Sequence, residues 1–168
     1  DIDDIIVFTS NGDMIVTKVD SKKFVAKNIL YVSVFKKRDS RTIYNMIYKE
    51  GKSGVSYIKR FNVTGVTRDK TYNLTSQNPK TKILHFSANP NGEAEIVTIQ
   101  LRQSGSIKKL KWDLDFADLA IKGRSVKGNI VSKYSVNKVI FKEKGLSTLK
   151  PRKIWFDDTV QRLSLIHI

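Results

Sequence analysis

Short segments in which apolar and polar residues alternate recur along this chain, and turn residues separate them. A period of two residues is typical of half-buried β-strands, and an Asn-Gly pair such as Asn11-Gly12 is typical of a tight hairpin turn. The predicted hairpins pair residues 6–8 with 14–16, 42–48 with 55–58, 83–86 with 96–101, and 139–141 with 154–156. One short helical turn is expected at residues 116–120. The pattern therefore predicts an all-β fold.

The predicted hairpins repeat along the chain. Their first strands end on the aromatic residues Phe8, Tyr48, Phe86 and Phe141, and the first two intervals are close to 40 residues. A period of this length with a few strands in each repeat is typical of bladed β-architectures, because one hairpin cannot bury its apolar face alone. A basic β-sandwich would give a similar alternation and remains the alternative at this stage.

The composition excludes several classes of protein. Forty per cent of the 168 residues are hydrophobic, which excludes a disordered basic tail. The absence of Cys excludes a disulfide scaffold, a cysteine-based zinc site and a thiol nucleophile. His85 and His167 have no suitably spaced carboxylates, so no metal site is expected. No apolar run approaches the roughly 20 residues of a membrane helix, and no membrane association is expected. Because the chain begins with Asp1, we expect it to be part of a longer protein.

The charge points to a polyanionic partner. Thirty-one Lys and Arg against 16 Asp and Glu give a net charge of +15. The first 20 residues are acidic overall, whereas residues 119–156 hold ten cations against Glu143 alone. A protein that neutralises phosphates with Lys and Arg releases condensed counterions, and this favours nucleic-acid binding. A Lys-rich surface without a partner is the alternative.

Clustered cations are the predicted DNA-contacting residues, and no catalytic residue is predicted. They are Lys59, Arg60, Arg68, Lys70, Lys108, Lys109, Lys111, Lys122, Arg124, Lys127, Lys133, Lys138, Arg152 and Lys153. Asp113, Asp115 and Asp118 lie in a short alternating segment and are interpreted as solvated or salt-bridged carboxylates. No nucleophile and base can be paired, so a hydrolase on a β-scaffold is not favoured.

The segment from Gly123 to Asn129 is the predicted phosphate-binding loop. Gly123 and Gly128 permit a positive φ or a close backbone approach, and Arg124 and Lys127 place cations between them. The segment is not a Walker loop, which would need Lys and then Ser or Thr after the second glycine. An ordinary turn with scattered cations is the alternative.

Four long stretches resemble the C-terminal domain of bacterial type IIA topoisomerase A subunits. They are TIYNMIYKEGKSGVSYIKRFNVTGVTRDKTYNL (42–74), HFSANPNGEAEIV (85–97), IKGRSVKGNIVSKY (121–134) and RKIWFDD (152–158). The resemblance is strongest to the topoisomerase IV A subunits of Bacteroidetes. It implies that residues 1–168 form a single domain, a β-pinwheel of about four strand-exchanging blades that is either closed or open. Duplex DNA would bend around its basic rim.

The resemblance also implies a division of labour with other domains. Gyrase A subunits carry a Gln-Arg-Arg-Gly-Gly-Lys-Gly box, whereas residues 123–129 keep two glycines and two cations without the arginine pair. This favours a topoisomerase IV-like role over a gyrase with a degenerate box. A basic adaptor for RNA or protein is the other alternative. The strand-cleaving tyrosine, ATP and magnesium would belong to other domains of a cytoplasmic, nucleoid-associated enzyme, whose partners are duplex DNA, an ATPase B subunit, and a second A subunit.

Overall fold

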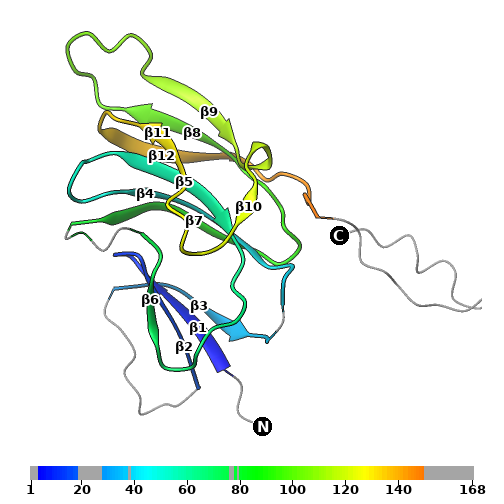
Figure 1. The fold of residues 1–168 in the computed structure, drawn as a ribbon. Coiled ribbons are helices and arrows are strands. Elements are labelled where there is room, and N and C mark those ends of the chain that lie inside the picture. Colours follow the sequence, from blue (N-terminus) through cyan, green and yellow to red (C-terminus); the bar gives the residue numbers. More distant parts are fainter. Residues whose placement is uncertain (1–3, 19–27, 38, 76–77, 79, 150–168) are drawn as a thin grey trace, which may run out of the picture.

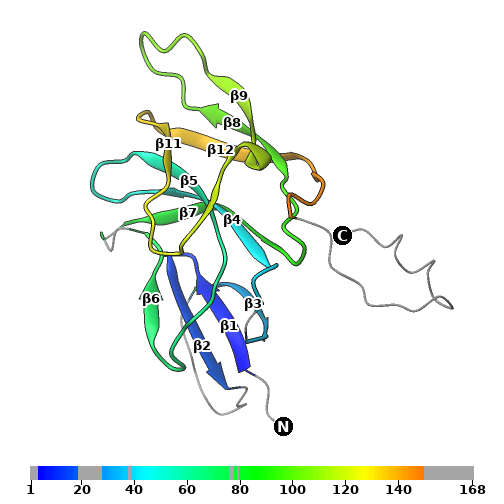
Figure 2. The same ribbon diagram turned by 45° about the vertical axis from the view of Figure 1, so that its right-hand side comes forward.

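The computed structural model describes residues 4–18, 28–37, 39–75, 78 and 80–149, which form three β-sheets and one short 3-10 helix. The sheets lie one after another along the long axis of the molecule (Figure 1). The same order is visible after a turn of 45° (Figure 2). The all-β prediction is confirmed. The predicted helical turn is also present, as the 3-10 helix Phe116–Asp118, which the Asp115 side chain caps by accepting a hydrogen bond from the Ala117 amide.

The first sheet has the strand order β3-β1-β2-β6. Its strands are β1 (Asp4–Thr9), β2 (Asp13–Lys18), β3 (Ile29–Phe35) and β6 (Thr71–Asn73). β1 and β2 form the predicted hairpin, in which Phe8 lies opposite Met14. Gly12 has a φ of +95° in the turn, a conformation that glycine adopts without a Cβ penalty.

The second sheet has the strand order β7-β4-β5-β10, and β11 also pairs with β5. Its strands are β4 (Ile43–Lys49), β5 (Ser56–Phe61), β7 (Lys82–Asn89), β10 (Ile121–Lys122) and β11 (Asn129–Ser132). β4 and β5 form the second predicted hairpin. The third sheet has the order β12-β8-β9, formed by β8 (Ile96–Leu101), β9 (Lys111–Asp115) and β12 (Val136–Glu143).

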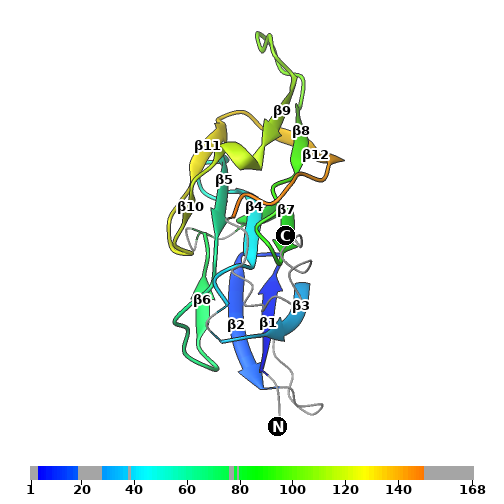
Figure 3. The ribbon, with the colours of Figure 1, turned by 90° about the vertical axis from the view of Figure 1, so that its right-hand side faces the viewer.

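Two of the sheets are completed by strands from later in the chain. β6 follows β5 in sequence but pairs with β2 of the first sheet. In the same way, β10 and β11 follow β9 but pair with β5 of the second sheet. This exchange is the pinwheel-like feature that the resemblance implied. Figure 3 shows β6, β10 and β11 along one side of the molecule, which we call the exchange side, and β3, β7 and β12 along the opposite side.

One predicted hairpin is wrong. Residues 83–86 and 96–101 do form strands, but β7 pairs with β4, whereas β8 pairs with β9 and β12 in another sheet. The Asn89 side chain links the end of β7 to β4 by donating a hydrogen bond to the Ile43 carbonyl. Gly92, with a φ of +68°, then directs the chain toward the third sheet. Phe86 and Phe141 therefore lie on β7 and β12, which are edge strands equivalent to β3. Residues 154–156, the expected partner of the last predicted hairpin, lie outside the described residues.

Two apolar cores form between the sheets. The core between the first and second sheets contains Phe8, Tyr44 and Phe61, and the Phe8 and Tyr44 ring centroids are 4.8 Å apart. The core between the second and third sheets includes Ile47 and Phe116, and the partly buried Trp112 packs against it. Each sheet thus buries one face against its neighbour, which is why the repeats need one another.

Candidate nucleic-acid interface

The loop between β10 and β11, residues 123–128, lies on the exchange side. It joins β10 to β11, which both pair with the same edge of β5 (Figures 1 and 3). Gly128 has a φ of +100°, and a Cβ added there would lie 2.6 Å from the Ile58 carbonyl oxygen. Gly123 has open space around it and no positive φ. Of the two glycines in the predicted loop, Gly128 is the one that the backbone requires.

Lys59 lies beneath this loop rather than on the surface. Its side chain on β5 is buried, and its ammonium group donates to the carbonyl oxygens of Leu74, Arg124 (2.7 Å) and Val126 (2.9 Å). Burial lowers the pKa of Lys59 to about 8. Lys59, predicted to contact DNA, is therefore not available for such a contact in this structure, because all three of its donors are used inside the protein.

Arg60 is also buried, on the opposite face of β5. Its guanidinium donates to the Asn45 side chain (2.9 Å), to the Gly92 carbonyl (3.0 Å) and to the Thr148 hydroxyl (3.0 Å). The residue is 1% exposed. Arg60, also predicted to contact DNA, is not available for such a contact in this structure either, because its side chain points into the interface with the third sheet.

Arg124 and Lys70 meet at one aromatic ring. The Arg124 guanidinium lies 4.5 Å from the centroid of Tyr72, and the Lys70 ammonium lies 5.1 Å from it. Arg124 also donates to the Thr64 carbonyl at 2.9 Å. A cation over an aromatic face keeps its charge while losing rotational freedom. Two predicted cations that are 54 positions apart in the sequence therefore lie together on the exchange side.

Lys127 is held at the other end of the loop. Its ammonium lies 4.9 Å from the centroid of Tyr57 and 3.4 Å from the Glu50 carboxylate. A hydrogen bond to Tyr57 and the charge of Glu50 raise the pKa of Lys127. The Lys127 side chain is 57% exposed, so it stays accessible to an anion. Glu50 offsets part of its charge.

Arg68 is less available than predicted. Its guanidinium forms an ion pair with Asp4 through two contacts of 3.2 Å, and its side chain is 41% exposed. The pair links β1 to the segment before β6. A carboxylate of the protein thus already lies opposite the charge of Arg68.

The remaining described cations lie farther along the molecule. A groove of about 680 Å³ between the β8–β9 hairpin and β11 has Lys108, Lys109 and Lys133 on its wall and Trp112 and Tyr134 in its lining. β11 begins beside Gly128 and ends beside Lys133, so it connects the loop to this groove.

Lys111 and Lys138 are both paired in register with Gln100, on β9 and β12 respectively, and therefore lie on one face of the third sheet. Lys122, on β10, is exposed. Arg152 and Lys153 lie outside the described residues.

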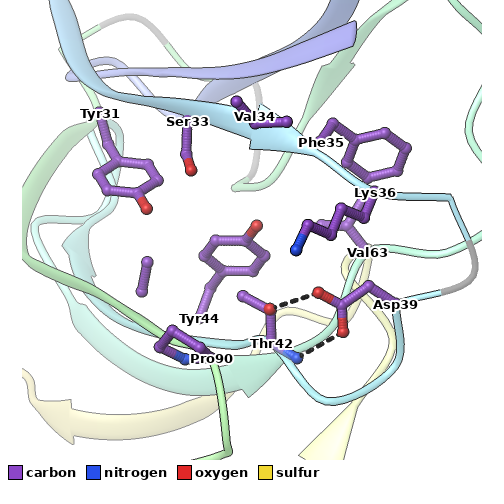
Figure 4. Close-up of a pocket in the computed structure, with 11 residues that line it drawn as sticks. Tyr31, Ser33, Val34, Phe35, Lys36, Asp39, Thr42, Tyr44, Val63 and Pro90 are labelled. Atoms are coloured by element: carbon purple, nitrogen blue, oxygen red, sulfur yellow. Dashed lines mark hydrogen bonds between the residues drawn. The ribbon is translucent and has the colours of Figure 1, made fainter. Parts of the chain in front are cut away.

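The cavity between β3 and β4 has a volume of about 80 Å³, enough for a few water molecules and well below that of a typical substrate pocket (Figure 4). There Asp39 accepts hydrogen bonds from the Thr42 hydroxyl and amide. No group of three or more His, Cys, Asp or Glu side chains in the described part of the chain could hold a metal ion.

Two of the predicted surface carboxylates, Asp113 and Asp115, have structural partners, as does the histidine of the described residues. Asp113 accepts from Thr98 and forms an ion pair with Lys142. His85 lies 2.7 Å from the buried Glu95 carboxylate, and this pair belongs to the interface between the second and third sheets.

The loop and its cations coincide with the part of the chain matched by one known family. The family model of the topoisomerase C-terminal domain of Bacteroidota matches residues 1–144. The chain belongs to this topoisomerase C-terminal domain family. It is also 27% identical over 141 residues to the A subunit of DNA topoisomerase 4 from Borreliella burgdorferi, a match that covers 83% of this chain and 21% of that protein.

The topoisomerase C-terminal domain described here thus spans about a fifth of the length of that relative. No solved structure matches the chain. Among the described residues, no helix has the length and apolar character that a bilayer span requires.

The prediction from sequence missed the aromatic residues that organise the loop. Tyr72 supports Arg124 and Lys70, Tyr57 supports Lys127, and the Tyr48 hydroxyl donates to the Lys127 carbonyl at 2.6 Å. Their sequence signal is weak, because a tyrosine in an alternating strand is equally typical of a core. The available signal was the spacing of Lys70 and Tyr72, because side chains two residues apart in an extended segment lie on the same face.

Proposed function

We propose that this topoisomerase C-terminal domain binds and bends duplex DNA along its exchange side. The observation that carries the proposal is the loop of residues 123–128, where Arg124 and Lys127 are supported by tyrosine rings and Lys70 lies beside them. Fixed cations on an exposed edge suit phosphate contacts, which position DNA without reading its sequence. The net charge of +15 agrees with a polyanionic partner.

The path of the DNA follows from the positions of the exposed cations. It would run from the loop along β11 to the lysines of the groove, Lys108, Lys109 and Lys133. Contacts at both ends of such a path would favour a bent duplex over a straight one, since bending brings more phosphates to the protein. The proposed role is to present a bent DNA segment to a strand-passage site elsewhere in a topoisomerase IV-like protein.

The proposal assigns no chemistry to this chain. ATP, magnesium and DNA cleavage would belong to other domains and to the partner subunits, which are an ATPase B subunit plus a second A subunit. The same proposal places the whole protein with the nucleoid in the cytoplasm. An incubation of the chain with supercoiled DNA and magnesium should therefore leave no covalent adduct on any of its six tyrosines.

The test compares two pairs of neutralised cations. Arg124→Gln with Lys127→Gln removes the loop charges, whereas Lys36→Gln with Lys82→Gln removes two exposed charges next to β3 and in β7, on the opposite side. Affinity for a labelled duplex is measured between 50 and 200 mM salt. The loop pair should lower the slope of log affinity against log salt by about 2, because each lost phosphate contact removes about 0.9.

The control pair should change the slope little, and ring-closure rates should fall with the loop pair alone. If both pairs changed the salt slope and the ring-closure rate equally, the DNA would not bind specifically along the exchange side. A preference for RNA, or no binding to either nucleic acid, would favour the adaptor alternative.

A further inference from the structure

The carbonyl groups of the loop point into the protein. The Arg124 and Val126 carbonyls accept hydrogen bonds from the Lys59 ammonium, and the Lys127 carbonyl accepts one from the Tyr48 hydroxyl. Both donors come from the second sheet, Tyr48 from β4 and Lys59 from β5. Three of the four carbonyls from residue 124 to residue 127 are therefore turned toward the sheet.

The direction of these carbonyls fixes the direction of the amides that follow them. In a trans peptide the C=O and the next N–H point in opposite directions, and the described chain has no cis peptide bond. The amides of Ser125, Lys127 and Gly128 thus point away from the sheet. Within the described part of the chain these three amides donate no hydrogen bond, whereas the Val126 amide donates to the Gly123 carbonyl at 3.2 Å.

Lys59 is the group that imposes this arrangement. A protonated lysine has three donors and no acceptor, which matches the three carbonyls around it. A neutral amine would offer two donors and would place a lone pair against the third carbonyl. The side chain is 4% exposed, so water cannot readily replace a lost contact.

We propose that Lys59 is a positioning residue, which turns the loop carbonyls inward so that the amides of Ser125, Lys127 and Gly128 bind a DNA phosphate together with the Arg124 and Lys127 side chains. The outward amides of Lys127 and Gly128 belong to successive peptides, an arrangement that forms a concave anion site in many proteins, and the Ser125 amide lies two residues before them. This inference rests on the proposed function, because it names the chemical group of the duplex that the loop recognises.

The groups around Lys59 make its protonation testable. From β4, the Tyr48 ring lies 6.0 Å from the ammonium, and from β5 the Phe61 ring lies 5.1 Å from it. Burial raises the pKa of the Tyr48 phenol, so it stays neutral over the useful range. From the loop, Lys127 has a raised pKa. Among the described residues no carboxylate pairs with Lys59, whose pKa of about 8 lies well below the raised pKa values of Tyr48 and Lys127.

The first experiment observes the amides directly in the unmodified chain. A ¹⁵N-labelled sample is titrated by NMR with a short duplex and, separately, with inorganic phosphate. The inference expects the amide protons of Ser125, Lys127 and Gly128 to move downfield with both probes, as new hydrogen bonds form. If the duplex binds while these three amides stay unmoved, the amide site is refuted.

The second experiment removes the ammonium. Lys59→Met keeps an unbranched apolar stem, and Lys82→Met on β7 is the matched loss of one exposed lysine. Lys59→Met should weaken duplex affinity on the order of tenfold at pH 7, the equivalent of one or two lost charge-assisted hydrogen bonds, and Lys82→Met should weaken it much less. Thermal unfolding of both variants reports whether the fold is kept.

The pH profile separates positioning from a general loss of structure. The duplex affinity of the wild type should fall as the pH rises from 7 to 9, because the Lys59 ammonium loses its proton in this range. The duplex affinity of Lys59→Met should change much less over the same range. If Lys59→Met does not fold, the pH profile of the wild type and the amide titration still test the inference. If the duplex affinities of the wild type and of Lys59→Met change in parallel with pH, the proposed role of Lys59 is refuted. Loss of binding in the Arg124→Gln/Lys127→Gln pair with no response of the amides refutes this inference alone, whereas no duplex binding by the wild type refutes the proposed function.

Discussion

Glu95 should stabilise the interface between the second and third sheets in a pH-dependent way. Its carboxylate is 4% exposed and accepts from the Asn45 side chain of β4, and it lies 2.7 Å from His85 of β7. Burial on its own raises the pKa of Glu95, but hydrogen bonds from His85, Ser87 and Asn45 outweigh burial and lower it to about 2. The ordinary value, expected in the unfolded chain, is 4.5.

The magnitude follows from this difference. A pKa that is lower in the folded state adds stability above the unfolded value, and that stability is lost as the pH falls toward the folded value. A shift from 4.5 to about 2 corresponds to about 3 kcal/mol at pH 7, since each pKa unit is worth about 1.4 kcal/mol. By pH 3 about half of this contribution should be gone.

The assay is urea unfolding of the wild type, Glu95→Gln and the control Glu143→Gln, an exposed carboxylate on β12, at pH 7 and pH 3. Glu95→Gln should lower the free energy of unfolding by about 2 to 3 kcal/mol at pH 7 and by clearly less at pH 3. The control should change it by less than about 0.5 kcal/mol. The reasoning would be refuted if Glu95→Gln lowered the free energy of unfolding equally at both pH values, or by no more than Glu143→Gln does.

Three further substitutions test the loop and the buried cations. Gly128→Ala should lower the free energy of unfolding by about 1 to 3 kcal/mol and weaken duplex binding, because the φ of Gly128 is +100° and an added Cβ would meet backbone atoms. Gly123→Ala should change neither stability nor binding, as measured by urea unfolding and gel shifts. Arg60→Met should lower the free energy of unfolding by about 2 to 4 kcal/mol, since it removes three hydrogen bonds, one of them to the buried Asn45 oxygen, and a loss below about 1 kcal/mol would contradict this. Tyr48→Phe removes one loop hydrogen bond and should lower stability by about 1 kcal/mol while reducing duplex affinity a few-fold; unchanged affinity would mean that the hydroxyl does not hold the loop.

The sequence predicted the strands well because their signals are local. Alternation and turn glycines identified the β1–β2 and β4–β5 hairpins, in which the turn also sets the register. The partner of β7 was predicted wrongly, since alternation reports that a residue is half-buried and not which strand lies beside it. The exchanged strand β6 pairs with β2, more than 50 residues earlier, and no local signal specifies such a pairing.

The candidate site was predicted in part for the same reason. Gly128 and its neighbouring cations were recognisable, because a positive φ and a flanking charge are properties of a short segment. The clustering of Lys70 with Arg124 depends on Tyr72 and on strand exchange, so the contact could be identified only in three dimensions. Lys and Arg were assigned to the surface by default, since they are rarely buried without partners.

Lys59 and Arg60 show why that default fails in this fold. Adjacent residues on a strand point to opposite faces, so in the central strand β5 both faces are covered and neither side chain can reach solvent. Lys59 connects β5 to the Leu74 carbonyl after β6 and to the loop, whereas Arg60 connects β5 to Gly92 and Thr148 beside the third sheet. Lys59 satisfies three backbone carbonyls next to the exchanged strands, and Arg60 adds a donor to the Gly92 carbonyl, which also accepts from the Thr148 amide. A basic pair inside an otherwise apolar strand is therefore better interpreted here as the link between neighbouring sheets than as a DNA contact.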